Sequence, residues 1–364
     1  MTSPRLPAGY SVRRPTLADG EAILAVVHAA ERDALGRDDS TLAEVHELLR
    51  LPRTPPATDH WLVEANGQAA AWGMVIDNHG GENVDVDVYA DPVHPEQVRQ
   101  ALLDIVLERV REHANQRRTG EVIVGAGVIV GDEPYAAELR ARGFVIERRF
   151  NQLRVELDPG RPFPSAPHGL ALEGFDPTSD SDWRDWHDVM QSSFVEHWGY
   201  EPMDLSAFRE SVTAEDDPEF GRWRFGLVDG ARAGICQASG RFAVDEGGWI
   251  RYLGILPAAR GRGAARYLLE HLLALYAADG RRWAGLTVDT EHGTGALRLY
   301  DSAGTGARIE IAAVARGLHQ RHQCIGHARQ RRHHHQHPRA LGLARAHQPD
   351  DVVGAHGDIT LASV

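Results

Sequence analysis

The sequence predicts a mixed α/β protein that contains two copies of one folding unit. Two stretches share one scheme of apolar strand, acidic residue, glycine turn and small-residue strand: WLVEANGQAAAWG at 61–73 and FGLVDGARAGIC at 225–236. This scheme is typical of a β-hairpin. A segment rich in proline and glycine, LDPGRPFPSAPHG at 157–169, lies between them and indicates a linker. The chain has 364 residues, which favours two domains, because one domain usually takes about 100 to 200 residues.

The elements around the two hairpins follow the same order. A helical pattern precedes each hairpin, a strand follows it, and a second helix, another strand and a short helix come next. We expect these elements at 17–35, 83–92, 95–114, 121–130 and 134–144 in the first half, and at 179–194, 248–257, 263–280, 283–290 and 295–304 in the second. Two copies of one α/β unit explain this order most simply. One continuous large α/β sheet is the alternative.

The same patterns divide the chain into four segments. Residues 1–156 form the first domain, which ends in the alternating strand FVIERRFNQLRVELD, and 157–169 form the linker. Residues 170–304 form the second domain. Residues 305–364 form a tail rich in histidine and arginine. We expect the second domain to carry the chemistry, for the reasons given below.

Overall composition is that of an ordinary globular protein. The formal charge of −13 argues against nucleic-acid binding, because phosphate attraction needs a basic surface. Two cysteines cannot build a disulfide framework, and no apolar stretch is long enough for a signal peptide or a membrane span. We therefore expect a cytoplasmic protein without a membrane partner. The sequence contains no lysine, which excludes lysine Schiff-base chemistry and a P-loop lysine.

The stretch LPAARGRGAARYLLEHLL at 256–273 predicts an anion-binding turn. A strand ends at Pro257, and Gly263 opens a helix whose leucines recur at helical spacing. The unpaired amide groups of the first helical turn, at the positive end of the helix dipole, face whatever lies over the turn. Gly261 and Gly263 allow close approach, and Arg260 and Arg262 add charge-assisted donors. The dinucleotide fingerprint fails because Arg266 replaces its third glycine.

This turn resembles the pyrophosphate-binding segment of the Gcn5-related N-acetyltransferases. The family signature has Arg or Gln, two residues, Gly, one residue, and Gly or Ala. Here it comprises Arg260, Gly261, Arg262, Gly263, Ala264, Ala265 and Arg266, after a family-like LGILP at 253–257. The alternative is a plain helix cap with a solvated arginine face. The resemblance covers about residues 10–305 and implies a tandem fold of the mycothiol-synthase type, with acetyl-CoA as co-substrate and no metal.

The resemblance also implies a mechanism and its residues. An amine of a small molecule would attack the thioester carbon directly. The edge of the strand at Leu253, Gly254 and Ile255 would bind the pantetheine arm, and the Ile255 N–H would stabilise the carbonyl oxygen as negative charge develops. Tyr300 would be the general acid, although a tyrosine packed on the core is the alternative. The family's second cofactor segment expects an asparagine where this chain has His292.

The general base has several candidates. Glu196 and His197 lie in SSFVEHWGYEP at 192–202, where this fold places acceptor-binding groups, and histidine needs little change of pKa to act near neutral pH. Glu246, just before the fourth strand of the second copy, is another candidate. A water relay would need no side chain. Each of the three side chains has a solvated surface position as its alternative.

The first copy lacks the cofactor turn. Its corresponding stretch, ADPVHPEQVRQALL at 90–103, contains no glycine between Pro92 and the helix. We therefore expect no productive cofactor site in residues 1–156. The first domain either shapes the acceptor cleft or only stabilises the second domain.

The tail departs sharply from the rest of the chain. Residues 305–364 contain no Phe, Trp or Tyr, but nine of the 20 histidines and eight arginines against four acidic residues. This shift indicates biased, disordered sequence that begins with a shifted reading frame near residue 305. ARIEIAAV at 307–314 is a candidate sixth strand, but no stretch offers a seventh, so we expect an open edge beside the acceptor cleft.

Three functional hypotheses follow. The first is an acetyl-CoA-dependent N-acetyltransferase that acts on a small-molecule amine. The second is a catalytically silent CoA-binding or scaffolding protein, which the degenerate first copy and the unusual tail favour. The third is a metal-binding module in RRHHHQHPR at 331–339, since imidazoles are good ligands. The sequence predicts no oligomeric state.

Overall fold

A computed structural model gives the fold of this chain. It describes residues 6–77, 83–116, 121–197, 200, 202–213, 215, 217–290, 299, 307–319 and 361–363. The first half contains β1 (Tyr10–Arg13), α1 (Gly20–Leu35), α2 (Leu42–Arg50), α3 (Pro56–Asp59), β2 (His60–Ala65), β3 (Gln68–Ile76), β4 (Asn83–Ala90), α4 (Glu96–Gln116), β5 (Glu121–Ile129), α5 (Glu133–Ala141) and β6 (Val145–Glu156). The second half contains β7 (Leu170–Gly174), α6 (Asp180–Phe194), α7 (Leu205–Thr213), β8 (Arg224–Val228), β9 (Ala231–Ser239), β10 (Gly247–Ile255), α8 (Ala264–Ala278), β11 (Trp283–Asp289), β12 (Ala307–His319) and β13 (Leu361–Ser363).

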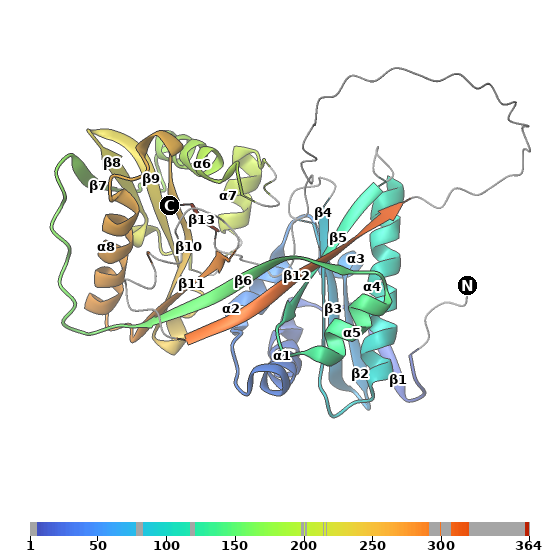
Figure 1. The fold of residues 1–364 in the computed structure, drawn as a ribbon. Coiled ribbons are helices and arrows are strands. Elements are labelled where there is room, and N and C mark those ends of the chain that lie inside the picture. Colours follow the sequence, from blue (N-terminus) through green and yellow to red (C-terminus); the bar gives the residue numbers. More distant parts are fainter. Residues whose placement is uncertain are drawn as a thin grey trace, which may run out of the picture.

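The predicted mixed α/β architecture with two copies is confirmed. Both halves have the expected order of helix, hairpin, strand, helix and strand. In the described part of the chain, all strands belong to one mixed sheet of 13 strands (Figure 1). Its order is β1-β2-β3-β4-β5-β12-β6-β11-β10-β9-β8-β7, and β13 pairs with β10. The two alternatives from the sequence, two copies of one unit and one continuous sheet, therefore both hold, because the sheets of the two copies join edge to edge.

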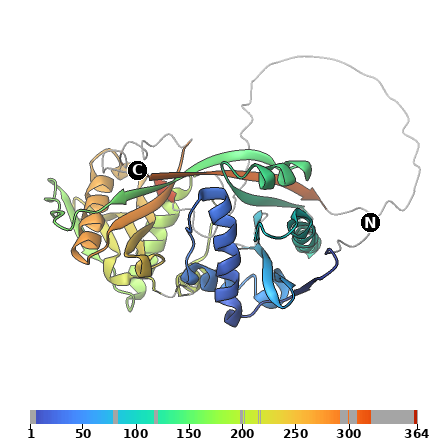
Figure 2. The same cartoon turned by 90° about the horizontal axis from the view of Figure 1, so that it is seen from below.

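The joint is a reciprocal exchange of strands. β12 of the second half lies between β5 and β6 of the first half, antiparallel to both. β6 of the first half lies between β12 and β11, and its residues 150–156 pair with 283–289. Both views show β6 and β12 running side by side between the two halves (Figures 1 and 2). Each half thus receives, beside its fifth strand, the sixth strand of the other half.

This exchange corrects the expectation of an open edge in the second half. The place beside β11 is filled by β6 over the full length of β11. The sequence of the second half contains no pattern for this strand, because β6 belongs to the first half. The segment expected as a tail also contributes β12, which begins at Ala307. The expected helix at 295–304 and most of the tail fall outside the described residues, apart from Leu299.

Helices cover both faces of the sheet in each half. In the first half, Trp72 and Met74 of β3 pack in one cluster with α1 and α2. Gly73 faces the other side, where a Cβ atom would lie 3.0 Å from Leu102 and Val106 of α4. Apolar residues on both faces of one strand are typical of a sheet covered on both sides. The second half repeats this arrangement, with α6 and α8 in place of α1 and α4.

Candidate acyl-carrier site

Strands β10 and β11 diverge in the middle of the second half. They pair in parallel only at Gly247–Trp249 with Trp283–Gly285. Beyond that point, β10 has a register shift against β9 between Ile250 and Tyr252. A bulge of this kind bends a strand and interrupts pairing. The divergence leaves one backbone edge of β10 without β11 as its neighbour at Leu253, Gly254 and Ile255, where the sequence predicted the pantetheine-binding edge.

The C-terminal strand β13 lies beside this diverging edge. Its residues 361–363 pair in parallel with Tyr252, Leu253 and Gly254 of β10. A short peptide segment can therefore add to this edge through backbone hydrogen bonds. The edge is thus suited to an extended ligand with amide groups.

The predicted anion-binding turn follows β10 directly. A short helix, η4 (Pro257–Ala259), leads to Gly261 and Gly263, which have φ angles of +75° and +83°. These angles favour glycine, because a Cβ atom disfavours the left-handed region. A Cβ atom at either glycine would meet nothing within 4 Å, so the space over the turn is open.

Helix α8 begins immediately after this turn. No side chain caps its N-terminus at Gly263, and its first turn contains no acidic residue. The amide groups of the first turn therefore keep their positive partial charge for another partner. Ala264 and Ala265 are buried and add no bulk above the turn, whereas Arg266 is exposed. This combination fits a phosphate-sized anion.

The arginines of the turn have different roles. Arg260 folds back, since its Nε donates to the Ile255 carbonyl oxygen at 3.2 Å and its Nη2 donates to the Ser193 carbonyl oxygen at 3.1 Å. Arg262 forms a two-point ion pair with Asp229 at 2.6 and 3.0 Å, which lowers the pKa of Asp229. Arg266 makes no ion pair with any described residue. Arg260 therefore holds the turn against α6, and Arg266 is available to a ligand.

Two of the three base candidates lie close to this turn. Glu196 is largely exposed, and its carboxylate is 3.4 Å from Arg260. His197 is buried, and its ring centroid lies 5.0 Å from that of Phe194. The Phe194 ring in turn contacts Tyr252 of β10, with the two ring centroids 5.7 Å apart. Both candidates thus lie at the end of α6 that faces the diverging part of β10.

The third base candidate lies at the other end of β10. Glu246 pairs with Arg282 at 2.6 Å, and both side chains are mostly exposed. It precedes the nine residues of β10, so about 30 Å of extended strand separates it from the turn. The structure therefore does not bring Glu246 together with Glu196 and His197. Tyr300 and His292 lie outside the described residues.

A buried ion network at the bulge escaped the sequence analysis. The two ends of the Arg251 guanidinium contact Glu215 and Glu47, and the Glu47 oxygen is 2.8 Å away. Ser239 donates a hydrogen bond to Glu215 at 2.9 Å. Glu47 belongs to α2 of the first half, so this network joins both halves next to the diverging edge. A single arginine in the apolar strand GGWIRYLGI was the signal that could have revealed it.

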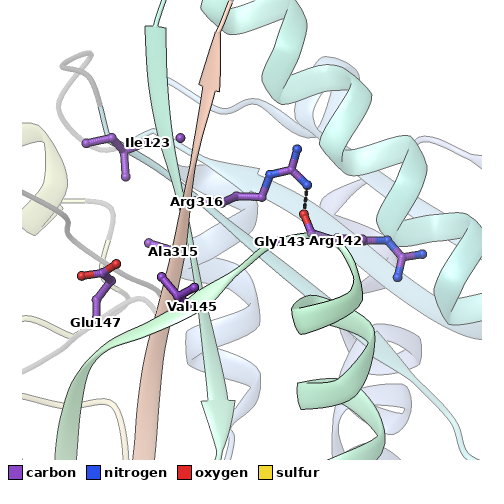
Figure 3. A pocket seen from close by; sticks show the side chains of 8 residues that line it. Ile123, Arg142, Gly143, Val145, Glu147, Ala315 and Arg316 are labelled. Carbon is purple, nitrogen blue, oxygen red and sulfur yellow. Dashed lines mark hydrogen bonds between the residues drawn. The ribbon is translucent and has the colours of Figure 1, made fainter.

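Two cavities lie near the exchanged strands. One of about 540 Å³ lies where β12 enters between β5 and β6 (Figure 3). There Arg316 donates a hydrogen bond to the carbonyl oxygen of Arg142, and burial lowers the pKa of Arg316. The other, of about 100 Å³, lies between the two halves. None of the predicted catalytic or cofactor residues lines either cavity.

The described residues contain neither a metal-ligating cluster nor a helix that could span a membrane. Among the described residues, no cluster of three or more His, Cys, Asp or Glu side chains is placed to hold a metal ion. The histidine-rich stretch 331–339 falls outside those residues. No helix in the described ranges has the length and apolar character that crossing a bilayer requires.

Comparison with known proteins finds one family model that matches part of the second half. Residues 183–305 match the acetyltransferase (GNAT) family. No curated protein sequence gives a significant match.

Solved structures share the fold of nearly the whole chain. A GCN5-related N-acetyltransferase from Sphaerobacter thermophilus has 23% identity and a TM-score of 0.73, with 86% of this chain and 98% of that chain covered. A tandem GNAT protein from the clavulanic acid biosynthesis pathway has 15% identity and a TM-score of 0.62, with 85% of this chain and 98% of that chain covered. An N-myristoyltransferase from Saccharomyces cerevisiae has 11% identity and a TM-score of 0.57, with 87% of this chain and 82% of that chain covered. These similarities establish a tandem GNAT fold.

Proposed function

We propose that this chain, whose residues 183–305 match the acetyltransferase (GNAT) family, transfers the acetyl group of acetyl-CoA to an amine of a small molecule. The observation that carries the proposal is the divergence of β10 from β11 directly before an uncapped helix N-terminus. The diverging edge suits an extended amide-containing arm, and the helix N-terminus suits a diphosphate. Both features lie within one continuous stretch, 250–266.

Different residues of this stretch would bind different parts of acetyl-CoA. The amide groups around Gly261 and Gly263 would hold the diphosphate, and Arg262 and Arg266 would add charge-assisted contacts. The edge at Leu253 to Ile255 would orient the pantetheine arm. Arg260 would hold the turn in place through its contacts with Ile255 and Ser193. When bound, acetyl-CoA supplies an activated acyl group as its thioester.

Proton transfer and charge stabilisation would fall to nearby groups. The N–H of Ile255 would donate to the carbonyl oxygen as negative charge develops on it, a contribution of a few kcal/mol in a site that excludes water. Glu196 or His197 would accept the proton of the ammonium, directly or through water, because both lie at the end of α6 near the diverging edge. Tyr300 would donate a hydrogen bond to the leaving thiolate.

The first half would contribute to the acceptor side. Glu47 reaches the bulge of β10 through Arg251, and α2 therefore borders the second half next to the diverging edge. An amine conjugate of the mycothiol-synthase type is one acceptor within this proposal.

A catalytically silent CoA-binding protein is the second candidate. The pairing of β13 with β10 favours it, because this pairing occupies the edge that the pantetheine arm would use. A thiol-release assay with acetyl-CoA and a panel of amines separates the two functions. Acetyl transfer predicts release of coenzyme thiol above background with at least one amine and a matching acetylated product. Binding of acetyl-CoA without release for every amine would support the silent protein.

A further inference from the structure

The last turn of α6 packs directly on the diverging edge of β10 at Gly254. A Cβ atom at Gly254 would lie 2.9 Å from the Phe194 ring, 2.9 Å from the Cβ atom of Ser193 and 3.2 Å from its Oγ atom. Helix α6 also contacts β13, the segment that pairs with this edge, with Cα atoms within 8 Å. The Ser193 hydroxyl therefore lies over the middle of the edge, next to the place of an added extended segment.

This hydroxyl has no hydrogen-bond partner. Ser193 is 0% exposed, and its Oγ atom is among the buried polar atoms of the described residues that make no hydrogen bond. It does not bond to a carbonyl oxygen of the preceding helical turn, as a serine in a helix often does. The backbone of Ser193 is held in place, because its carbonyl oxygen accepts a hydrogen bond from Arg260 at 3.1 Å. A buried hydroxyl without a partner is unusual, since its desolvation is not compensated.

Packing alone does not require a hydroxyl at this position. Ser193 belongs to the buried face of α6, together with Trp186, Met190 and Phe194. Alanine has the same Cβ atom and would keep its contact with Gly254 without burying a polar group. The hydroxyl is therefore explained by a hydrogen-bond partner that binds beside Gly254.

A second donor faces the same place from another direction. The Leu256 amide donates to the Ala233 carbonyl oxygen of β9. Backbone groups of an antiparallel strand point alternately to its two sides, so the N–H groups of Leu253 and Ile255 point away from β9, toward the diverging edge. The Ser193 hydroxyl approaches from the α6 face of the sheet. Two donors that approach from different directions suit an oxygen atom on which negative charge develops.

We propose that Ser193 is a catalytic residue whose hydroxyl donates to the carbonyl oxygen of the acetyl thioester, beside the N–H of Ile255. This inference rests on the proposed function. As the acceptor nitrogen bonds to the carbonyl carbon, one electron pair of the carbonyl moves onto the oxygen, and the Ser193 hydrogen bond strengthens. When the carbon–sulfur bond breaks, that pair restores the carbonyl and the sulfur leaves with the bonding pair. The surplus proton on nitrogen passes to Glu196 or His197, and Ser193 keeps its proton throughout.

The variant Ser193→Ala tests this role. Single-turnover release of coenzyme thiol is measured with acetyl-CoA and the amine of the panel that gives the highest rate, because single turnover isolates the chemistry from product release. S193A should lower this rate about 100-fold. Its affinity for acetyl-CoA in a calorimetric titration should stay within about twofold, because the hydrogen bond strengthens only as charge develops. Its unfolding temperature should not fall, because the hydroxyl loses no partner.

Tyr135→Phe is the matched control. Tyr135 of α5, in the first half, also carries a buried hydroxyl without a hydrogen-bond partner among the described residues. Y135F also removes one oxygen atom and should change neither the rate nor the affinity for acetyl-CoA.

The outcomes separate this inference from the proposed function. An unchanged rate in S193A, with an active unaltered chain, would overturn this inference alone. A lower unfolding temperature of S193A, with equal losses of rate and of acetyl-CoA binding, would also overturn it, because the hydroxyl would then be structural. No thiol release by the unaltered chain with any amine would overturn the proposed function and this inference with it.

Discussion

The Glu47 carboxylate of the first half accepts a hydrogen bond from the Arg251 guanidinium of the second half at 2.8 Å. Both side chains are mostly buried, and Glu215 contacts the same guanidinium from the other side. Arg251 lies at the bulge where β10 leaves β11. The position of the diverging edge therefore depends on a contact between residues that are 204 positions apart in sequence.

This contact predicts that Glu47→Ala destabilises the whole chain. The variant leaves a buried guanidinium with one carboxylate partner in place of two, and the free energy of unfolding should fall by roughly 1 to 3 kcal/mol. Urea denaturation followed by tryptophan fluorescence measures this change. E108A, at an exposed pair on α4, should change stability by less than about 0.5 kcal/mol. Equal effects of the two variants would show that the Glu47 contact does not join the halves.

The turn before α8 predicts that Gly263→Glu abolishes binding of acetyl-CoA. The substitution places a carboxylate where the first amide groups of α8 would meet a diphosphate. Gly280→Glu is the matched control, because Gly280 has a φ angle of +79° at the other end of the same helix, and a Cβ atom there also meets nothing within 4 Å. Both variants should lose about 1 to 2 kcal/mol of stability through backbone strain. Only G263E should lose binding in a calorimetric titration.

The C-terminal strand predicts a gain in affinity on truncation. Removal of 361–364 frees the edge of β10 at 252–254 from its pairing with β13. An extended ligand then no longer competes with the chain's own backbone, so acetyl-CoA should bind more tightly. Titration of the truncated and full chains with acetyl-CoA measures the change. Weaker binding after truncation would instead make β13 part of the binding site.

Substitution of Tyr300 should affect turnover and not the binding of acetyl-CoA. If its hydroxyl assists departure of the thiolate, Tyr300→Phe should lower kcat by roughly 10- to 100-fold and leave the affinity for acetyl-CoA nearly unchanged. Steady-state thiol release and calorimetric titration give the two quantities separately. Unchanged turnover would refute the role of Tyr300 as the acid.

The raised pKa of Glu44 predicts that stability falls as pH rises. In the unfolded chain this carboxyl ionises near its ordinary pKa of 4.5, whereas in the folded chain it ionises near 7. The folded state therefore binds more protons between these values, and raising the pH through this interval removes up to about 3 kcal/mol of stability. Urea denaturation at pH 5 and pH 8 should show this fall, and E44Q should reduce it. An identical pH dependence in E44Q would contradict the assignment.

Local patterns predicted most of the fold. The helical spacing of leucines predicted α8, and the strand, glycine and helix order predicted the turn at 260–266, because these features depend on neighbouring residues. The exchange of β6 and β12 could not be predicted in the same way. Its register joins residues such as Gln152 and Thr287 that are far apart in sequence, and both strands have alternating patterns that fit several partners.

Candidate site residues were predicted with uneven success for the same reason. The contacts of Arg260 with Ile255 and Ser193 could not be predicted, because they depend on how the turn after β10 packs against α6. Glu246 was chosen for its position before a strand, but the direction of β10 carries it to the end away from the turn. The Arg251 network depends on the contact between the two halves, which no local pattern records.

The most direct test of the account compares acetyl-CoA with acetyl-pantetheine, which keeps the thioester and the amide arm but lacks the diphosphate. If the amide groups around Gly261 and Gly263 hold the diphosphate, the full chain should bind acetyl-CoA at least tenfold more tightly, and G263E should remove this difference. Equal affinity of the unaltered chain for both compounds would contradict the assignment of the turn.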